Sequence, residues 1–193
     1  MDGTTAQAIE NNIAATTPIT VGFKRLTEDA VIPTKAHASD SGFDLVASAD
    51  VIIEPGATVV VPTGIAVQLP AGYEATVRPR SGVTSKTKLR IALGTIDNSY
   101  NGEVGVIVDN NAVNTVARDV VGVDMSYPLL HADGSESRLK THNNNAIYQI
   151  RKGDKVAQLV ITRLPEVEAV EVFDVEESER GENGFGSSGV SAV

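Results

Sequence analysis

The stretch from Leu93 to Val106 (LGTIDNSYNGEVGV) brings together residue types that could do chemistry. Asp97 stands at the start of a predicted turn, Tyr100 follows three residues later, and Gly102 lets the chain turn back. The valines beyond Gly102 recur at every second position, which is the period of a strand. The pattern predicts a β-hairpin with a carboxylate held at its turn, where it could act as a general base. Taken alone, the same residues are more typical of an ordinary solvated turn.

The C-terminal stretch ERGENGFGSSGVSAV has the composition of a phosphate-binding loop. Glycines let backbone N–H groups approach an anion, the hydroxyls of Ser187 and Ser188 can donate hydrogen bonds, and Arg180 supplies charge. No Lys follows the glycines and no strand-to-helix frame surrounds them, so this is not a Walker motif. A flexible linker is the alternative, but a linker has no use for the isolated ring of Phe185.

Two further segments could hold phosphates. PRSG (Pro79–Gly82) ends a predicted strand in Arg80 and Ser81, and KGDKVAQLV (Lys152–Val160) places Gln158 on the same side as Val156. Each signal is weak alone. The three histidines stand in predicted loops without the spacing of metal ligands.

The elements that must position these residues are strands. Only 4% of residues are aromatic and Trp is absent, so the core must consist mainly of Val, Ile, Leu and Ala, a composition that favours strands. Short alternating segments separated by Gly and Pro turns predict an antiparallel sandwich or barrel. The expected strands are residues 19–26, 43–47, 51–56, 65–69, 73–78, 156–161 and 168–177, with a single short helix near Val83–Lys86.

Composition also excludes several classes of protein. The chain has no Cys, so disulfides and thiolate chemistry are ruled out. A net charge of −9 argues against general binding of nucleic acid or of anionic membranes. The sequence contains no membrane span of 18 apolar residues and no secretory signal, so we expect a cytoplasmic protein.

The 193 residues predict one β domain with appendages. We expect a flexible tail over residues 1–18, a core over 19–174 and a C-terminal arm over 175–193. Residues 109–145 are rich in Asn, Asp, Ser and Gly and are too long for a hairpin loop, which predicts an inserted flap.

Five segments in this order resemble the motifs of the trimeric dUTP pyrophosphatases (dUTPases). They are ASDSGFDL (Ala38–Leu45), PRSG (Pro79–Gly82), GTIDNSYNGEVGV (Gly94–Val106), KGDKVAQLV (Lys152–Val160) and RGENGFGSSG (Arg180–Gly189). The resemblance implies a jelly-roll-like β subunit, a homotrimer with active sites shared between subunits, and Mg²⁺-assisted hydrolysis of dUTP to dUMP and pyrophosphate. For a phage-encoded protein it implies the cytoplasm of a bacterial host.

The resemblance also implies a role for each site residue. Asp97 would be the general base, Tyr100 would pack beneath the deoxyribose and exclude a 2′-hydroxyl, and Asp44 would support Mg²⁺ through water. The residues expected to contact substrate are Arg80, Ser81, Gly82, Gly94, Ile96, Tyr100, Gln158, Arg180, Phe185, Gly186, Ser187 and Ser188. Ser188 replaces a Thr that is common in the family, which keeps the hydroxyl.

The insert resembles the extra segment of some bacteriophage dUTPases and leaves open a regulatory protein partner that binds through residues 109–145. A dCTP deaminase-like relative is the nearest alternative enzyme, but that chemistry needs a site centred on Glu. A repressor-binding regulatory protein and a trimeric structural protein are alternatives from other classes, and the structural protein would not need PRSG or the glycine-rich arm.

Overall fold

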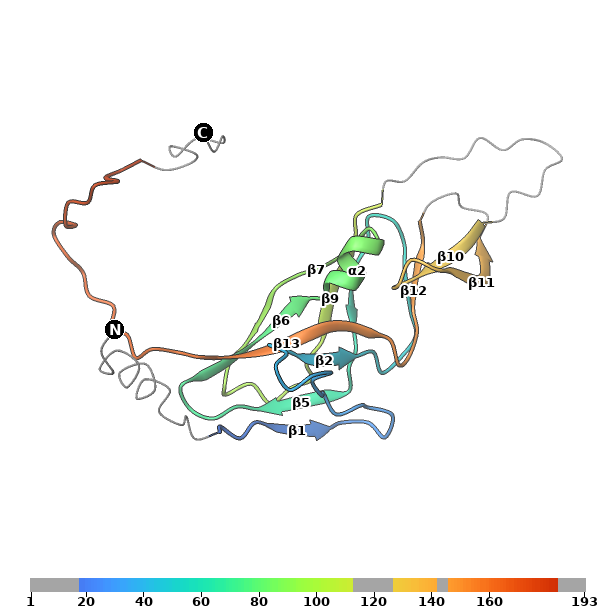
Figure 1. Cartoon of the computed structure of the whole chain (residues 1–193), viewed down its shortest axis with the longest axis horizontal. Coiled ribbons are helices and arrows are strands. Elements are labelled where there is room, and N and C mark those ends of the chain that lie inside the picture. Colours follow the sequence, from blue (N-terminus) through green and yellow to red (C-terminus); the bar gives the residue numbers. More distant parts are fainter. Residues whose placement is uncertain (1–17, 113–126, 142–145, 184–193) are drawn as a thin grey trace, which may run out of the picture.

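The structure, a computed structural model, describes residues 18–112, 127–141 and 146–183, and these residues form an all-β fold with one short helix, α2 (Ser81–Lys86). Figure 1 shows the strands gathered in one body, from which the C-terminal segment leads away. The strands in chain order are β1 (Gly22–Arg25), β2 (Phe43–Val46), β3 (Val51–Ile53), β4 (Thr58–Val61), β5 (Ile65–Gln68), β6 (Tyr73–Pro79), β7 (Leu89–Ile91), β8 (Gly94–Ile96), β9 (Val106–Asn110), β10 (Tyr127–His131), β11 (Glu136–Thr141), β12 (Tyr148–Ile150) and β13 (Lys155–Arg163).

The long strand β13 organises the sheet that carries the candidate site. The order in this sheet is β2-β13-β6-β8, and every pairing in it is antiparallel. Three further sheets are present in the described part of the chain. They have the strand orders β4-β9-β7, β1-β5 and β11-β10-β12-β3. The expected all-β, jelly-roll-like fold is confirmed.

The core follows from the alternation of apolar residues in the strands. In β9 the side chains of Val106 and Val108 are fully buried while Ile107 between them is 40% exposed. Leu45, Val77 and Leu159 are buried on the neighbouring strands β2, β6 and β13. Each fully buried aliphatic side chain stabilises the fold by about 1.5–3 kcal/mol through removal from water.

Part of the predicted insert extends a sheet of the core. Strands β10 and β11 form an antiparallel hairpin, and β10 pairs in parallel with β12, which pairs with β3. The segment entering the insert is fixed by Asn110, a buried residue of β9 whose Nδ2 donates to the carbonyls of Ile53 (3.0 Å) and Ala146 (2.8 Å). The bond to Ala146 holds the beginning and end of the insert close together, and the bond to Ile53 ties them to β3.

Two of the expected elements are wrong. The segment around Asp97 is not a hairpin, because β8 pairs with β6 whereas β9 pairs with β4 and β7. Residues 97–105 instead cross from one sheet to another. Residues 168–177 form no strand in the described chain, although their alternation fits one.

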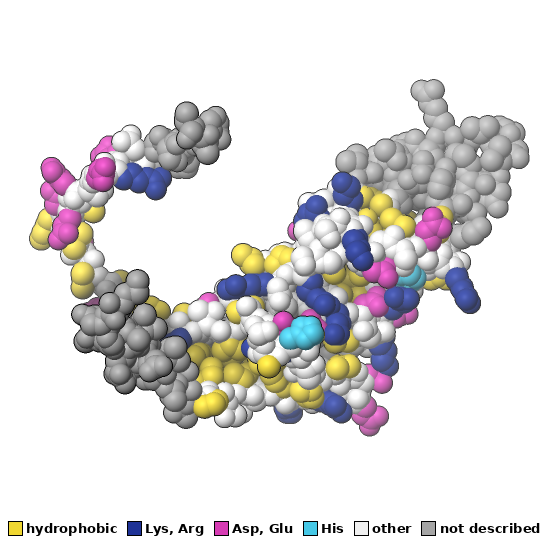
Figure 2. All heavy atoms as spheres, viewed as in Figure 1, with side chains coloured by type: hydrophobic (Ala, Val, Ile, Leu, Met, Phe, Trp, Pro, Cys, Tyr) yellow, Lys and Arg dark blue, Asp and Glu magenta, His cyan; other side chains and the backbone are white. Residues whose placement is uncertain are grey.

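The segment from Pro165 to Asn183 lies outside the core. Its apolar side chains are exposed, with Val167 at 85% and Phe173 fully exposed. Figure 2 shows acidic and hydrophobic side chains along this segment. A strand-forming sequence without a neighbouring strand in its own chain cannot complete a ladder, which explains the failed prediction. Among the described residues no helix is long and apolar enough to cross a membrane.

Candidate active site

Strands β2, β6 and β13 bring three of the predicted motifs together. Gln158 lies at the centre of β13 and pairs in register with Asp44 on β2 and Arg78 on β6. Arg80 follows the end of β6, where the chain turns into α2. The sheet register therefore places Asp44, Arg80 and Gln158 close together.

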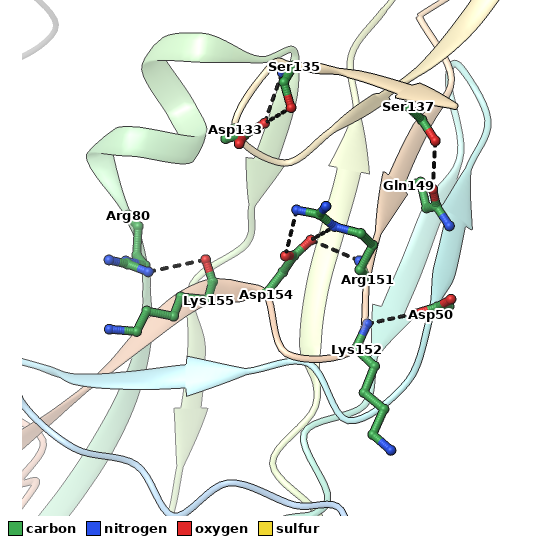
Figure 3. Close-up of polar contacts among 10 residues, drawn as sticks. All are labelled: Asp50, Arg80, Asp133, Ser135, Ser137, Gln149, Arg151, Lys152, Asp154 and Lys155. Carbon is green, nitrogen blue, oxygen red and sulfur yellow. Dashed lines mark hydrogen bonds and ion pairs between the residues drawn. The ribbon is translucent and has the colours of Figure 1, made fainter. Parts of the chain in front are cut away.

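Asp44 is the electrostatic centre of this site. Its side chain is only 12% exposed and lies between two cations, with Arg80 Nε 3.4 Å from Oδ1 and Lys155 Nζ 2.7 Å from Oδ2. The contact with Lys155 is an ion pair, and within the described residues Oδ2 accepts no hydrogen bond. Arg80 also donates from Nη1 to the Lys155 carbonyl at 3.2 Å, which fixes the guanidinium beside β13 (Figure 3).

Gln158 is held by its neighbours. Its Nε2 donates to the Pro79 carbonyl at 3.0 Å, which ties β13 to the end of β6. Gly42 leaves the space that this side chain occupies, since a Cβ at that position would lie 2.8 Å from Gln158 Oε1. The amide is half-buried, and its fixed orientation suits it to positioning a bound group.

Ser81 and Gly82 form the exposed first turn of α2. The helix begins where the Arg80 carbonyl accepts from the N–H groups of Val83 and Thr84, both at 3.1 Å. Buried Val83 anchors the helix to the core, and Thr87 ends it with a hydroxyl that donates to the Val83 carbonyl at 2.7 Å. The predicted helix at Val83–Lys86 is confirmed and starts two residues earlier.

Asp97 and Tyr100 lie on a tight loop after β8. The Tyr100 N–H donates to the Asp97 carbonyl at 3.0 Å, and the Tyr100 hydroxyl donates to the Glu103 carbonyl at 3.0 Å. The ring lies directly over Gly102, where a Cβ would be 2.6 Å from Cζ of the ring. Asp97 and Tyr100 are both exposed, so this compact loop presents a carboxylate and an aromatic ring to solvent.

Glu103 fixes that loop to the body of the protein. Its Oε1 accepts from the backbone N–H groups of Thr63 (3.0 Å) and Gly64 (2.7 Å). The Thr63 hydroxyl, which is buried, donates to the Val104 carbonyl at 2.6 Å. Bonds to a charged acceptor contribute about 1.5–3 kcal/mol each, so Glu103 is the main anchor of the loop. Sequence reasoning did not single out Glu103, because its partners lie about 40 residues away in the chain.

The remaining predicted residues fall in three groups. Gly94 and Ile96 belong to β8, where they pair with Val77 and Ala75 of β6. The Ile96 side chain is buried, so only its backbone can face a ligand. Arg180 is exposed on the C-terminal arm, with Nε donating to the Asn183 carbonyl at 2.8 Å. Phe185, Gly186, Ser187 and Ser188 lie outside the described residues.

The two halves of the site are far apart within one chain. Asp97 directly follows Ile96, which pairs with Ala75 near the start of β6, whereas Arg80 follows the end of that strand. Arg80 is five residue steps along the chain from Ala75, which is roughly 17 Å at 3.3 Å per residue. The carboxylate of Asp97 and the Arg80 cluster therefore cannot contact the same phosphate group in a single chain.

The β fold, the Asp97 loop and the cluster of Asp44, Arg80 and Gln158 agree with one class of nucleotide-hydrolysing protein. The profile of the dUTPase family matches residues 28–119 and 138–189. The chain belongs to the dUTPase family. The profile leaves residues 120–137 unmatched, and these lie within the predicted insert.

Individual relatives cover nearly the whole chain. A deoxyuridine 5′-triphosphate nucleotidohydrolase of Clostridium tetani is 35% identical over 90% of this chain and 99% of its own. The dUTPase of Staphylococcus bacteriophage 80alpha, solved with dUPNHPP, has a TM-score of 0.79 at 35% identity and covers 89% of this chain and 99% of its own. The dUTPase of phage phi11 of S. aureus, described as having a species-specific insert, has a TM-score of 0.73 at 32% identity over 83% of this chain and 100% of its own.

Proposed function

We propose that this chain is a dUTP diphosphatase that hydrolyses dUTP to dUMP and pyrophosphate. The observation that carries this proposal is the family match across both halves of the site, from the Asp44 and Arg80 motifs to the Gln158 motif and the arm. The relatives named above as dUTP hydrolases support the same substrate. The geometry supplies positioning and charge, which are the main requirements of phosphoryl chemistry.

Asp97 is the proposed general base. Its carboxylate would take a proton from the water that attacks the α-phosphorus, so that the bond between the α-phosphorus and the bridging oxygen breaks and pyrophosphate leaves. The hydrogen bonds that the Glu103 carboxylate accepts from the backbone N–H groups of Thr63 and Gly64 support this role, because they hold the loop in one position. A general base contributes about 10²–10⁴-fold to the rate.

Tyr100 is proposed to select the sugar. The contact of its ring with Gly102 and its hydrogen bond to Glu103 fix the ring at the surface beside Asp97. A deoxyribose packed on this ring would leave no space for a 2′-hydroxyl, so UTP would be rejected by steric overlap. Gly94 and the backbone of Ile96 would contact the uracil edge.

The phosphates are proposed to be held by Arg80, Ser81, Gly82 and Gln158. Mg²⁺ would be bound to the triphosphate. Asp44 fits a metal held through water, because its carboxylate is little exposed and its Oδ2, which contacts the Lys155 ammonium at 2.7 Å, accepts no hydrogen bond from the described chain. No cluster of three or more His, Cys, Asp or Glu occurs in those residues, which suits an ion ligated by phosphates and water. The metal would neutralise phosphate charge, while the ion pairs with Arg80 and Lys155 hold the Asp44 carboxylate in place.

We propose that the active site is shared between the subunits of a homotrimer. The separation of Asp97 from Arg80 in one chain supports this, because a neighbouring copy must supply the missing half. The exposed apolar side chains at 167–175 support it as well, because they need a surface on another chain. Arg180 and the residues from Phe185 to Ser188 would then cover the nucleotide of a shared site.

A regulatory role of the insert is a second proposal. It is supported by the unmatched residues 120–137 and by the similarity to phage dUTPases, one of which is described as having a species-specific insert. Such a role would be additional to catalysis. A deaminase-like activity has less support, since the loop has Asp97 and Tyr100 at its tip.

The proposed activity is tested by incubating the purified protein and Mg²⁺ with each of dUTP, dTTP, dCTP and UTP. We expect dUMP and pyrophosphate from dUTP alone. Release of ammonia from dCTP would instead support the deaminase. No turnover of dUTP under these conditions would contradict the proposed function.

A further inference from the structure

A pocket of about 210 Å³ lies between α2, the turn of the insert and the turn from β12 to β13. Helix α2 contributes Lys86, the insert contributes Asp133, and the β12–β13 turn contributes Arg151 and Asp154. Arg80 and Lys155 of the candidate site line the same pocket. The pocket is therefore continuous with the proposed phosphate site, and the insert forms part of its wall (Figure 3).

The pocket is positively charged in an acidic protein. Four of its lining side chains are cations (Arg80, Lys86, Arg151 and Lys155) and two are carboxylates (Asp133 and Asp154), a net charge of +2. The whole chain has a net charge of −9. Such a local excess of cations attracts an anion despite the overall charge.

The guanidinium of Arg151 is fixed in an orientation suited to binding an anion. The Asp154 carboxylate accepts three hydrogen bonds from Arg151. They come from the backbone N–H at 2.9 Å, from Nε at 3.4 Å and from Nη2 at 3.2 Å. A guanidinium that is already oriented loses little conformational freedom when an anion binds. Lys86, on the opposite wall, forms an ion pair with no carboxylate in residues 18–112, 127–141 and 146–183, so its ammonium is available.

The insert turn is fixed against this pocket. Gly134 has a φ of +82° and lies against the end of α2, because a Cβ there would be 2.8 Å from the Lys86 carbonyl oxygen. The carboxylate of Asp133 accepts from the Ser135 hydroxyl at 2.6 Å and from the Ser135 N–H at 2.9 Å. The hydroxyl bond, more than the backbone bond, lowers the pKa of Asp133, so the insert brings a permanent negative charge to the pocket.

We propose that this pocket binds the pyrophosphoryl group, as the terminal phosphates of dUTP and as the pyrophosphate product. Arg151 and Lys86 attract the group, and Asp133 of the insert weakens its binding and so favours product release. The inference rests on the proposed function, and it makes the insert part of the active site. The inference is testable because removal of the Arg151 charge should weaken pyrophosphate binding, whereas removal of the Asp133 charge should strengthen it.

The test is calorimetric titration of the full-length protein with pyrophosphate, with inorganic phosphate as a second titrant. We expect Arg151→Gln to weaken pyrophosphate binding about tenfold or more, because a charged hydrogen-bond donor is lost. Arg151→Lys should restore only part of it, because Lys keeps the charge but lacks the guanidinium fork that Asp154 orients. Asp133→Asn should tighten binding about two- to fivefold, since one repulsive charge disappears. Each protein is first checked by its far-UV circular dichroism and melting temperature.

Arg138→Gln and Glu136→Gln are the matched controls, because both residues are exposed on β11 of the insert and neither lines the pocket. They should change pyrophosphate binding less than about twofold. An equal effect of Arg138→Gln and Arg151→Gln would overturn the proposal, and so would weaker binding by Asp133→Asn. The titration does not require turnover. If dUTP is hydrolysed but Arg151→Gln binds pyrophosphate normally, only this inference fails; if dUTP is not hydrolysed, the proposed function fails on its own evidence.

Discussion

Replacing Gly102 with Ala tests how the Tyr100 ring is positioned. Gly102 is not among the glycines with positive φ, so Ala fits the backbone, and the three atoms nearest to the new Cβ all belong to the Tyr100 side chain. Cζ of the ring would be 2.6 Å away and Cε2 3.0 Å away, which the ring can relieve only by moving. We therefore expect Gly102→Ala to displace the ring while leaving the strands on either side in place.

The expected change in stability is small. Displacement breaks the hydrogen bond from the Tyr100 hydroxyl to the Glu103 carbonyl, a loss of about 0.5–1.5 kcal/mol. The reduced freedom of Ala in the unfolded chain offsets this by about 0.4–1 kcal/mol. Denaturant unfolding should therefore give a free energy of unfolding within about 1 kcal/mol of wild type.

The effect on selectivity should be much larger. If the ring excludes the 2′-hydroxyl, its displacement should reduce the preference for dUTP over UTP by about 10–200-fold, the range for steric contacts of this size. Tyr100→Phe is the matched control, because it removes the hydroxyl bond and leaves the ring. The assay is kcat/KM for both nucleotides. Unchanged discrimination in Gly102→Ala would refute the assignment of Tyr100 as the residue that selects the sugar.

Three further predictions concern the base, the arm and the insert turn. Asp97→Asn should reduce kcat for dUTP by about 10²–10⁴-fold with nearly unchanged binding, measured by turnover and titration with a non-hydrolysable analogue; wild-type turnover would show that Asp97 is not the base. Removal of residues 180–193 should abolish nearly all activity but leave the oligomer intact in sedimentation analysis, because the apolar segment at 167–175 stays; dissociation would show a structural arm. The Asp133 carboxyl should titrate below its ordinary pKa of 3.8 in an NMR titration, and Ser135→Ala should raise that pKa. The contribution of Asp133 to stability should be present above the unfolded pKa and lost as pH falls through the lowered pKa of the folded state. An unchanged pKa in Ser135→Ala would contradict this account.

The sequence predicted the fold class, because alternating apolar residues and Gly and Pro turns are local patterns. The residues of the Asp44 site came from the resemblance to the dUTPase motifs, and their roles stay predictions. Alternation in β6 and β9 determines which side chains face the core, and the structure agrees. Alternation does not determine which strands pair. The loop at Asp97 therefore looked like a hairpin, although its flanking strands belong to two different sheets. The segment at 168–177 was predicted as a strand for the same reason, but its chain provides no partner.

The insert contains a local signal for the hairpin that it forms. Asp133-Gly134 between two polar-apolar segments is typical of a hairpin turn, and the structure has the β10–β11 hairpin there. Its contact with Lys86 could not have been foreseen, since it depends on how β10 adds to β12. The anchor at Glu103 was hidden in the same way, because nothing in its local spacing indicates the backbone of Thr63 and Gly64 as partners.

Mixing two inactive variants tests most directly the claim that dUTP is hydrolysed at a site shared between copies. Asp97→Asn removes the base from one half, and Arg80→Gln removes the cation from the other half. After the two proteins are unfolded together and refolded in equal amounts, about a quarter of the sites should combine an intact Asp97 with an intact Arg80 from a neighbouring copy in a closed ring. The account predicts dUTP hydrolysis at about a quarter of the wild-type rate in the mixture, and almost none in either variant alone. A mixture as inactive as its two components would contradict the shared site.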